Sequence, residues 1–176
     1  GAALAIGIDI SDESVRNANA DAKALGLDNV VFVQADAENT CLPDSSVDVI
    51  LCSGMLHHLD LSYAFPELRR ILKPGGRILA GEALNCNPFI KLYRKLTKSM
   101  RTEWEANHIL GLADLDFAAR FFDIREVRFW HVVGYLGAHL PLFKGIFDSL
   151  DRFVLERIPL VNRMAWIFTF EMRSLK

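Results

Sequence analysis

Short apolar runs alternate with helical patterns along the first half of the chain. Residues 4–9, 30–33 and 47–52 are apolar runs of the kind that buried parallel strands show on both faces. The segment between the first two runs repeats apolar residues at helical spacing. These residues are Val15, Ala18, Ala22 and Leu25. Strands that alternate with helices of this length form right-handed crossovers. The pattern therefore predicts an α/β fold with a Rossmann-like, mostly parallel sheet and helices on both faces.

Polar residues and glycines mark the ends of these elements. Ser11 is placed to cap the first helix, and Gly26 is placed to end it in the left-handed conformation. A second helix follows the third apolar run, and Pro66 is expected in its first turn, because deeper in a helix a proline removes a backbone hydrogen bond. The Leu-Lys-Pro-Gly-Gly sequence at residues 72–76 then predicts a turn into a strand over residues 77–83.

The second half of the chain predicts two more helices and two more strands. The first helix covers residues 88–98, and the second is capped by Asp114 or Asp116. Residues 124–133 return to the alternation of a strand, and residues 166–173 form a closing strand with its more apolar side buried. The last two strands are expected to form an antiparallel pair.

We interpret residues 1–176 as a single domain with two insertions. Residues 85–111 and 134–161 break the strand and helix rhythm, and we expect them to shape a substrate site or a lid. The second insertion contains a helix with an apolar face predicted to point inward and a charged face predicted to point outward. The inward residues are Ile146, Phe147, Leu150, Phe153 and Val154, and the outward residues are Asp148, Asp151, Arg152 and Glu156.

Composition narrows the function classes. The chain is 51% hydrophobic and 24% charged, which excludes the disordered class. A net charge of -2 provides no basic face for nucleic-acid binding, so a small-molecule substrate is expected. Cys41, Cys52 and Cys86 are odd in number and lack the spacing of metal ligands, which favours no metal site and a reducing, cytoplasmic location. No uncharged apolar run reaches the roughly 18 residues of a transmembrane span.

Several motifs occur in an order that resembles the class I S-adenosylmethionine-dependent methyltransferases, of the type 11 kind. Asp9 ends one strand, Asp36 follows the next, and the Leu-Pro-Asp-Ser-Ser-Val-Asp run at residues 42–48 leads into a third before Lys73-Pro-Gly-Gly76. The resemblance implies a methyltransferase that uses S-adenosylmethionine. In that family a first strand and a glycine-rich cofactor loop precede these motifs. We therefore expect a chain truncated before Gly1, which alone binds the cofactor weakly.

The resemblance also implies cofactor-binding residues. Asp9 matches the acid that accepts hydrogen bonds from both ribose hydroxyls, and Ile10 is the residue beside it. Asp36 matches the acid that accepts from the adenine amine, with the amide of Ala37 reaching a ring nitrogen. The alternatives are that Asp9 only ends a strand or caps a helix, and that Asp36 is an ordinary turn aspartate.

The segment after the third apolar run is expected to lie between cofactor and acceptor. Ser53 and Gly54 are further candidate cofactor-binding residues, since a glycine allows backbone to approach a ligand closely. His57 and His58 are the candidate catalytic residues, because imidazole is suited to proton transfer near neutral pH. The alternative is that both begin a helix and are satisfied by backbone.

Acceptor-side residues are predicted from the insertions. Tyr93, Arg101 and His108 are the candidates. The basic helix over residues 88–98 could be a lid over an acidic or phosphorylated acceptor, and the alternative is an ordinary solvated helix face. The apolar residues 129–143 could touch lipid, so peripheral membrane contact is a further hypothesis. Two other functions stay open: a non-catalytic, methyltransferase-like interaction module, and a nicotinamide-dependent dehydrogenase, for which no Tyr-x-x-x-Lys pair is present.

Overall fold

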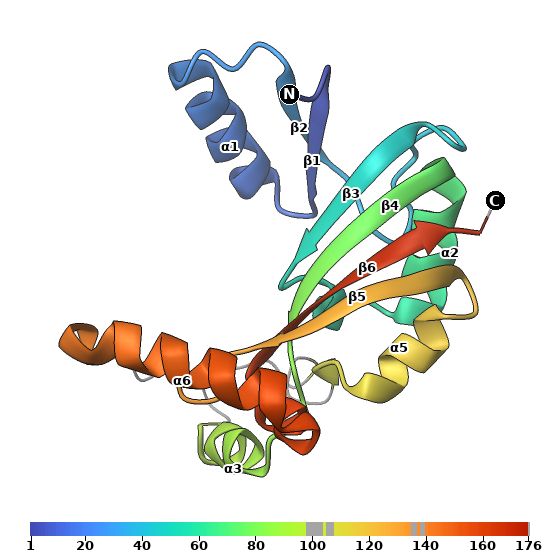
Figure 1. Cartoon of the computed structure of the whole chain (residues 1–176). Helices are drawn as coiled ribbons and strands as arrows, with labels where there is room; N and C mark the ends of the chain where they lie inside the picture. Colours follow the sequence, from blue (N-terminus) through green and yellow to red (C-terminus); the bar gives the residue numbers. More distant parts are fainter. Residues whose placement is uncertain (98–103, 105–107, 135–136, 138–139, 176) are drawn as a thin grey trace.

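The computed structural model describes residues 1–97, 104, 108–134, 137 and 140–175, and its strands form two sheets (Figure 1). The smaller sheet pairs β1 (Ala5–Asp9) with β2 (Val30–Gln34) in parallel. The larger sheet has the order β3-β4-β6-β5, with β3 and β4 parallel and β6 antiparallel to both its neighbours. Its strands are β3 (Val47–Ser53), β4 (Leu72–Ala83), β5 (Phe122–Trp130) and β6 (Ile167–Ser174).

The helices follow the strands in the order that the pattern predicts. The α-helices are α1 (Asp12–Ala24), α2 (Leu61–Ile71), α3 (Pro88–Leu96), α5 (Leu112–Ala118) and α6 (Lys144–Arg157). The 3₁₀-helices are η1 (Leu56–His58), η4 (Pro141–Phe143) and η5 (Pro159–Met164). The predicted α/β class is confirmed, and the antiparallel C-terminal strand pair is present with helices inserted between its strands.

The strands are divided between two sheets because β1 and β3 do not pair with each other. Each keeps one edge that no described strand occupies. Both strands run the same way in Figure 1, with their carboxyl ends toward the bottom of the view. The carboxyl ends of β1, β2 and β3 therefore still lie on one side of the molecule, which is where ligands bind in open parallel α/β sheets.

The predicted boundaries of α1 are confirmed. Ser11 is the N-cap, and its side chain accepts a hydrogen bond from the amide of Ser14 at 3.2 Å. The turn after the helix contains Gly26 at φ +67°, a backbone conformation that suits glycine. These local signals determine where the helix between β1 and β2 begins and ends.

The prediction that Pro66 lies in the first turn of its helix is wrong. α2 begins at Leu61, because Asp60 caps it by accepting from the amide of Ser62 at 2.9 Å, and Pro66 therefore lies inside the helix. A proline there leaves the helix one backbone hydrogen bond short. The helix tolerates this loss because its apolar face, which includes Phe65 and Leu68, is buried against the larger sheet.

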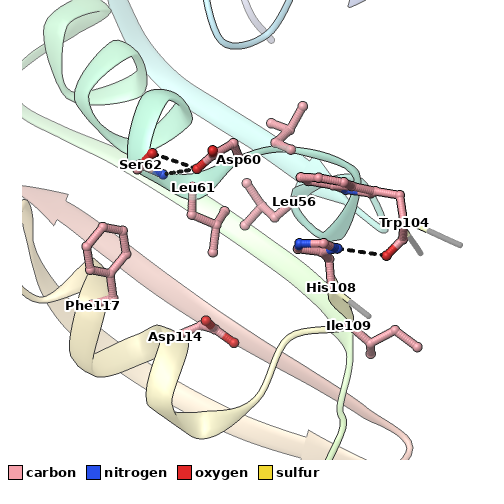
Figure 2. A pocket seen from close by; sticks show the side chains of 10 residues that line it. Leu56, Asp60, Leu61, Ser62, Trp104, His108, Ile109, Asp114 and Phe117 are labelled. Atoms are coloured by element: carbon pink, nitrogen blue, oxygen red, sulfur yellow. Dashed lines mark hydrogen bonds between the residues drawn. The ribbon is translucent and has the colours of Figure 1, made fainter. Parts of the chain in front are cut away.

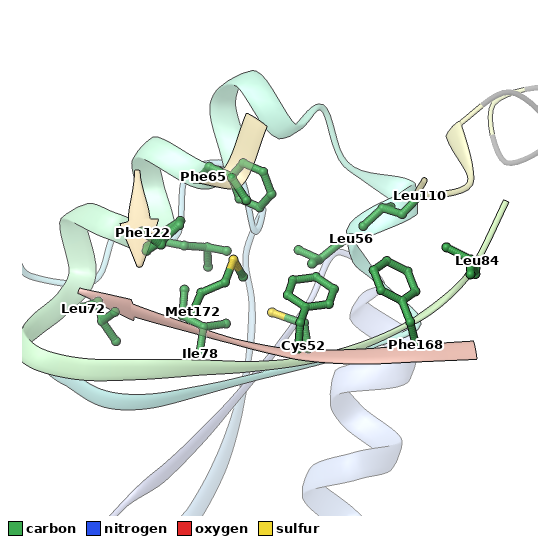
Figure 3. Packing of buried hydrophobic residues seen from close by; sticks show 14 of the residues in the cluster. Cys52, Leu56, Phe65, Leu72, Ile78, Leu84, Leu110, Phe122, Phe168 and Met172 are labelled. Atoms are coloured by element: carbon green, nitrogen blue, oxygen red, sulfur yellow. The ribbon is translucent and has the colours of Figure 1, made fainter. Parts of the chain in front are cut away.

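The core lies between α2, α5 and one face of the larger sheet (Figure 3). Phe65 packs at its centre, with its ring 5.9 Å from the rings of Phe117 and Phe122. From the sheet, Ile78 and Met172 are completely buried against the same helices. The alternation predicted for the closing strand is therefore confirmed, since Met172 and the residues two and four positions before it are all buried.

Two predictions about helix surroundings need correction. Neither Asp114 nor Asp116 is the N-cap of α5: the N-cap is Gly111, and Asp114 accepts from its amide at 2.7 Å from inside the first turn. Asp151 on α6, predicted to face solvent, is buried and accepts from the amides of Val133 at 2.8 Å and Gly134 at 2.9 Å. The reason is that these backbone donors need an acceptor, and Asp151 supplies it.

The consequence for α6 is that much of its apolar face is exposed. Only Phe147 and Val154 of the predicted inward residues are half-buried, while Asp148, Arg152 and Glu156 are exposed as predicted. Ile146, Leu150 and Phe153, expected to be inward, are 64%, 45% and 59% exposed. In Figure 1 the helix extends away from the larger sheet. Hydrogen bonds to Asp151, rather than burial of an apolar stripe, therefore determine which side of α6 faces the domain.

Candidate functional site

The acids that follow β1 and β2 lie at one edge of the smaller sheet. The parallel register pairs Asp9 with Gln34, and the amide of Ala35 donates to the carbonyl of Asp9 at 3.1 Å. Asp36 is the next residue along the chain, so both acids lie at the same end of the smaller sheet. Both side chains are exposed. The structure thus brings together the two acids that the sequence singles out.

Each carboxylate also makes the local contact that its alternative interpretation predicts. Oδ1 of Asp9 accepts from the amide of Ser11 at 2.8 Å, and Oδ1 of Asp36 accepts from the amide of Glu38 at 2.9 Å. These bonds orient the side chains without burying them. A carboxylate has two oxygens and about four acceptor positions, so a turn contact and a ligand contact are compatible.

The neighbours of the two acids line the same rim. The carbonyl of Ile10 accepts from Nε2 of Gln34 at 3.1 Å, which ties the loop after β1 to the end of β2, and the Ile10 side chain is 75% exposed. Ala37 is half-buried directly after Asp36. Apolar surface next to exposed acceptors is the combination that a nucleoside requires, with a flat base beside polar hydroxyls.

Gly54 directly follows β3, an edge strand of the larger sheet. Its amide donates to the carbonyl of Gly81 at 2.8 Å, and its φ of +60° lies in the left-handed region that favours glycine. Nothing lies within 4 Å of the position that a Cβ would occupy, and Ser53 before it is exposed. The backbone here is open to the approach of a ligand, as the sequence predicts.

The two histidines are held in the short helix η1 that follows. Nδ1 of His57 lies 2.8 Å from Oε2 of Glu82, and the ring of His57 lies against that of His58 at a tilt of 38°, with 4.1 Å between centroids. His57 is half-buried, and His58 is exposed. The interpretation that backbone satisfies His57 is incomplete, because its ring nitrogen has a buried carboxylate as partner.

A pocket of about 350 Å³ adjoins this segment (Figure 2). Its lining comes from η1, the start of α2, α5 and three residues of the segment between α3 and α5. The lining residues are Leu56, Leu59, Asp60, Leu61, Ser62, Trp104, His108, Ile109, Asp114 and Phe117. The rings of Trp104 and His108 stack with centroids 3.6 Å apart, and Nδ1 of His108 lies 2.8 Å from the Trp104 carbonyl.

Of the three predicted acceptor residues, the structure places one on this pocket. His108 lines it, Arg101 lies outside the described residues, and Tyr93 belongs to α3 but its side chain is not described. Asp60 adds a negative charge to the wall. Hydrogen bonds from the side chain and amide of Ser62 lower the pKa of Asp60, and the nearby His108 lowers it further.

Sequence reasoning missed three residues of this region: Glu82, Trp104 and Asp60. Glu82 interrupts the apolar strand that ends in Arg-Ile-Leu-Ala-Gly-Glu-Ala, and a lone acid in such a strand was the available signal. No group of three or more His, Cys, Asp or Glu side chains in the described part of the chain is arranged to hold a metal ion.

Comparison with known proteins decides the family. A family model described as a methyltransferase domain matches residues 1–80. An uncharacterized methyltransferase of Bacillus subtilis, YcgJ, is 41% identical over 139 residues, which are 72% of this chain and 51% of that protein. Residues 1–80 therefore carry a methyltransferase domain, and the similarities as a whole are those of the class I methyltransferases. The chain spans about half the length of this relative, and a smaller share of the others that it matches.

Further similarities are consistent with this family. The ubiquinone/menaquinone biosynthesis C-methyltransferase UbiE of Hahella chejuensis is 43% identical over 56 residues, which are 31% of this chain and 22% of that protein. Among solved structures, YcgJ aligns with a TM-score of 0.63 at 20% identity, over 99% of this chain and 83% of YcgJ. Geranyl diphosphate methyltransferase, solved in complex with GPP and sinefungin, aligns with a TM-score of 0.64 at 18% identity. The alignment covers 97% of this chain and 63% of that protein. These structures show a shared methyltransferase fold.

Proposed function

We propose that this methyltransferase chain transfers a methyl group from S-adenosylmethionine to a small-molecule acceptor. The observation that supports the proposal is that Asp9 ends β1 and Asp36 follows β2 at the same end of the smaller sheet, since the register pairs Asp9 with Gln34. Two exposed carboxylates at the carboxyl ends of adjacent parallel strands are suited to grip the two halves of an adenosine. The YcgJ and UbiE similarities and the methyltransferase neighbour solved with sinefungin, an analogue of this cofactor, support the same assignment.

The residues of the rim fit the cofactor. Asp9 would accept from the ribose hydroxyls and Asp36 from the adenine amine, and both carboxylates are exposed acceptors as these roles require. The Ala37 amide would donate to an adenine ring nitrogen, and the open backbone at Gly54 would allow close approach. The cofactor supplies an electrophilic methyl group, so the task left to the protein is to align the acceptor, exclude water and take up a proton.

The pocket beside η1 is the proposed acceptor site. Polar and apolar atoms share its wall about equally. The apolar part includes Leu56, Phe117 and Trp104, and the carboxylates of Asp60 and Asp114 disfavour an anionic group. An apolar or lipid-like acceptor is therefore favoured over an acidic one. The name of one similar protein, a ubiquinone/menaquinone biosynthesis C-methyltransferase, fits this choice.

Helix α3 supports contact with a lipid surface during acceptor capture. It exposes Phe89, Leu92 and Leu96, and it carries basic residues but no acidic ones. A basic helix with an exposed apolar face is typical of segments that lie on anionic membranes. No described helix is long and apolar enough to cross a membrane. We infer a cytoplasmic enzyme that meets its acceptor at such a surface.

A non-catalytic interaction module remains the second candidate, and the exposed apolar face of α6 is the observation that favours it. Transfer of a labelled methyl group separates the two. The full-length protein is incubated with S-adenosylmethionine carrying a tritiated methyl group and with a lipid extract or an aqueous small-molecule extract of cells. The proposal expects label in an organic-soluble product. Cofactor binding without label transfer to either extract would contradict it and favour the module.

A further inference from the structure

Glu82 is a buried carboxylate at the carboxyl end of β4. It is 1% exposed, and it lies opposite Phe168 of β6 in an otherwise apolar part of the sheet. Burying an ionised carboxylate is costly unless several hydrogen bonds compensate for the lost water. The residue must therefore be held by specific donors, and the identity of those donors indicates what it does.

Three donors converge on this carboxylate, and all of them come from the loop after β3. Oε1 accepts from the amide of Met55 at 2.9 Å and from the amide of Leu56 at 2.8 Å. Oε2 lies 2.8 Å from Nδ1 of His57. Because an ionised carboxylate can only accept, Nδ1 of His57 must carry a hydrogen, and in the neutral imidazole the other ring nitrogen, Nε2, then keeps its lone pair.

The neighbouring thiol does not share this charge. Burial, together with the charge of Glu82, raises the pKa of the Cys52 thiol to about 12. Cys52 therefore stays protonated and neutral at physiological pH. The negative charge of Glu82 is left to act on its hydrogen-bond donors, among which His57 is the one that can accept a proton.

His57 lies in the segment that joins the proposed cofactor rim to the proposed acceptor pocket. Gly54 precedes it by three residues, and Leu56 and Leu59 on either side of the histidine pair line the pocket. A group that takes a proton during methyl transfer is needed at this junction. The imidazole is half-buried, so it is sheltered from solvent without being sealed from it.

We propose that Glu82 is a positioning residue that fixes His57 in the Nδ1–H tautomer, so that Nε2 acts as general base toward an acceptor with a hydroxyl group or an acidic C–H bond. The inference rests on the proposed function. As the acceptor atom forms its bond to the methyl carbon, the S–CH₃ bond breaks and its electron pair stays on sulfur. The proton of the acceptor moves to Nε2, and the carboxylate stabilises the positive charge on the ring.

A purely structural role for Glu82 makes different predictions. Its bonds to Met55 and Leu56 also anchor the loop, so any variant that removes them could reduce activity by disordering η1. Glu82→Gln separates the two roles. The amide oxygen can still accept from both backbone amides, whereas the amide NH₂ must donate to Nδ1 of His57. The loop is kept, and the proton of the imidazole moves to Nε2.

The first readout is independent of activity. Long-range ¹⁵N–¹H NMR spectra of the full-length protein distinguish the two neutral tautomers, and His57→Gln assigns the signal among the five histidines. The wild type is expected to show Nδ1 protonated and Nε2 bare, and Glu82→Gln is expected to reverse them. An Nε2–H tautomer in the wild type would overturn the proposal, even if the variant fails to fold or the protein proves not to transfer methyl groups.

The second readout uses the methyl acceptor once label transfer has identified it. Glu82→Gln should lower kcat by roughly 10²- to 10⁴-fold, the usual range for general-base catalysis, with KM and cofactor affinity within about twofold. Glu67→Gln is the matched control, since it alters another buried carboxylate that binds Thr40 and Arg70 and no histidine. It should change neither the tautomer nor kcat. Unchanged kcat in folded Glu82→Gln would refute the positioning role.

Discussion

Asp151 of α6 accepts a hydrogen bond from the amide of Gly134, 2.9 Å away, although the sequence pattern predicts that Asp151 faces solvent. The contact is close: a Cβ on Gly134 would lie 2.5 Å from Oδ2 of Asp151. The other carboxylate oxygen accepts from the amide of Val133. A single side chain thus joins the helix of the second insertion to the segment that follows β5.

Replacing Asp151 with alanine should destabilise this part of the protein. Two backbone amides would lose their acceptor, and the expected loss is roughly 2–4 kcal/mol in the free energy of unfolding of the cooperative unit that contains α6. Urea unfolding followed by circular dichroism measures it. Asp148→Ala, on the exposed side of the same helix, should stay within about 0.5 kcal/mol of the wild type. Equal effects for the two variants would contradict the anchoring role.

Glu67 gives a prediction about pH. Hydrogen bonds from Arg70, and then from Thr40, lower the pKa of Glu67 from 4.5 to about 2 in the folded chain. As the pH falls, Glu67 is therefore protonated in the unfolded chain before it is protonated in the folded chain. The bonds therefore stabilise the fold fully above pH 4.5, and their contribution is lost as the pH falls from 4.5 to about 2.

This linkage is tested by measuring the free energy of unfolding of the wild type and of Glu67→Gln with a denaturant at several pH values. The variant should be less stable by roughly 1–3 kcal/mol at pH 7, and the gap should close as the pH falls below 4.5. Glu156→Gln, which changes an exposed carboxylate on α6, is the control and should show no such trend. A gap of the same size at pH 7 and pH 3 would show that the ionised carboxylate is not its source.

The cysteines should differ in reactivity. Cys52 is buried and its thiol pKa is raised to about 12, so almost no thiolate is present at pH 8, whereas Cys41 is exposed. Brief treatment of the folded protein with iodoacetamide should label Cys41 and leave Cys52 unlabelled until the chain is unfolded. Peptide mass spectrometry measures both sites. Labelling of Cys52 at a rate comparable to Cys41 would argue against the packing described around β3.

The sequence predicts the parts of the fold that depend on neighbouring residues. Apolar runs located β1, β2 and β3, and Ser11 and Gly26 located the ends of α1. The strand predicted after the Lys-Pro-Gly-Gly turn is present, but it already begins at Leu72. Asp9 and Asp36 could be singled out because each directly follows such a run. Their placement at one rim then follows from the parallel register alone.

The parts that sequence reasoning missed depend on contacts between distant residues. Glu82 meets its donors across more than 24 positions of the chain, and Asp151 meets Gly134 across 17. The spacing of apolar and polar residues along the sequence does not predict which carboxylates are buried as acceptors for backbone amides. Helical periodicity therefore assigned Asp151 to the solvent side, and the same reasoning left Glu82 as an ordinary strand residue.

Cofactor titration tests the central claim, that Asp9 and Asp36 together bind one adenosine, most directly. Isothermal titration of the full-length protein with S-adenosylmethionine is compared for the wild type, Asp9→Asn, Asp36→Asn and Asp28→Asn. The asparagine variants keep the turn contacts of Oδ1, and Asp28 is an exposed acid at the opposite end of β2.

The account predicts that Asp9→Asn and Asp36→Asn each weaken binding by roughly 10- to 100-fold, as the loss of a charge-assisted hydrogen bond implies, while Asp28→Asn binds like the wild type. Affinity that is the same in all four proteins would contradict it.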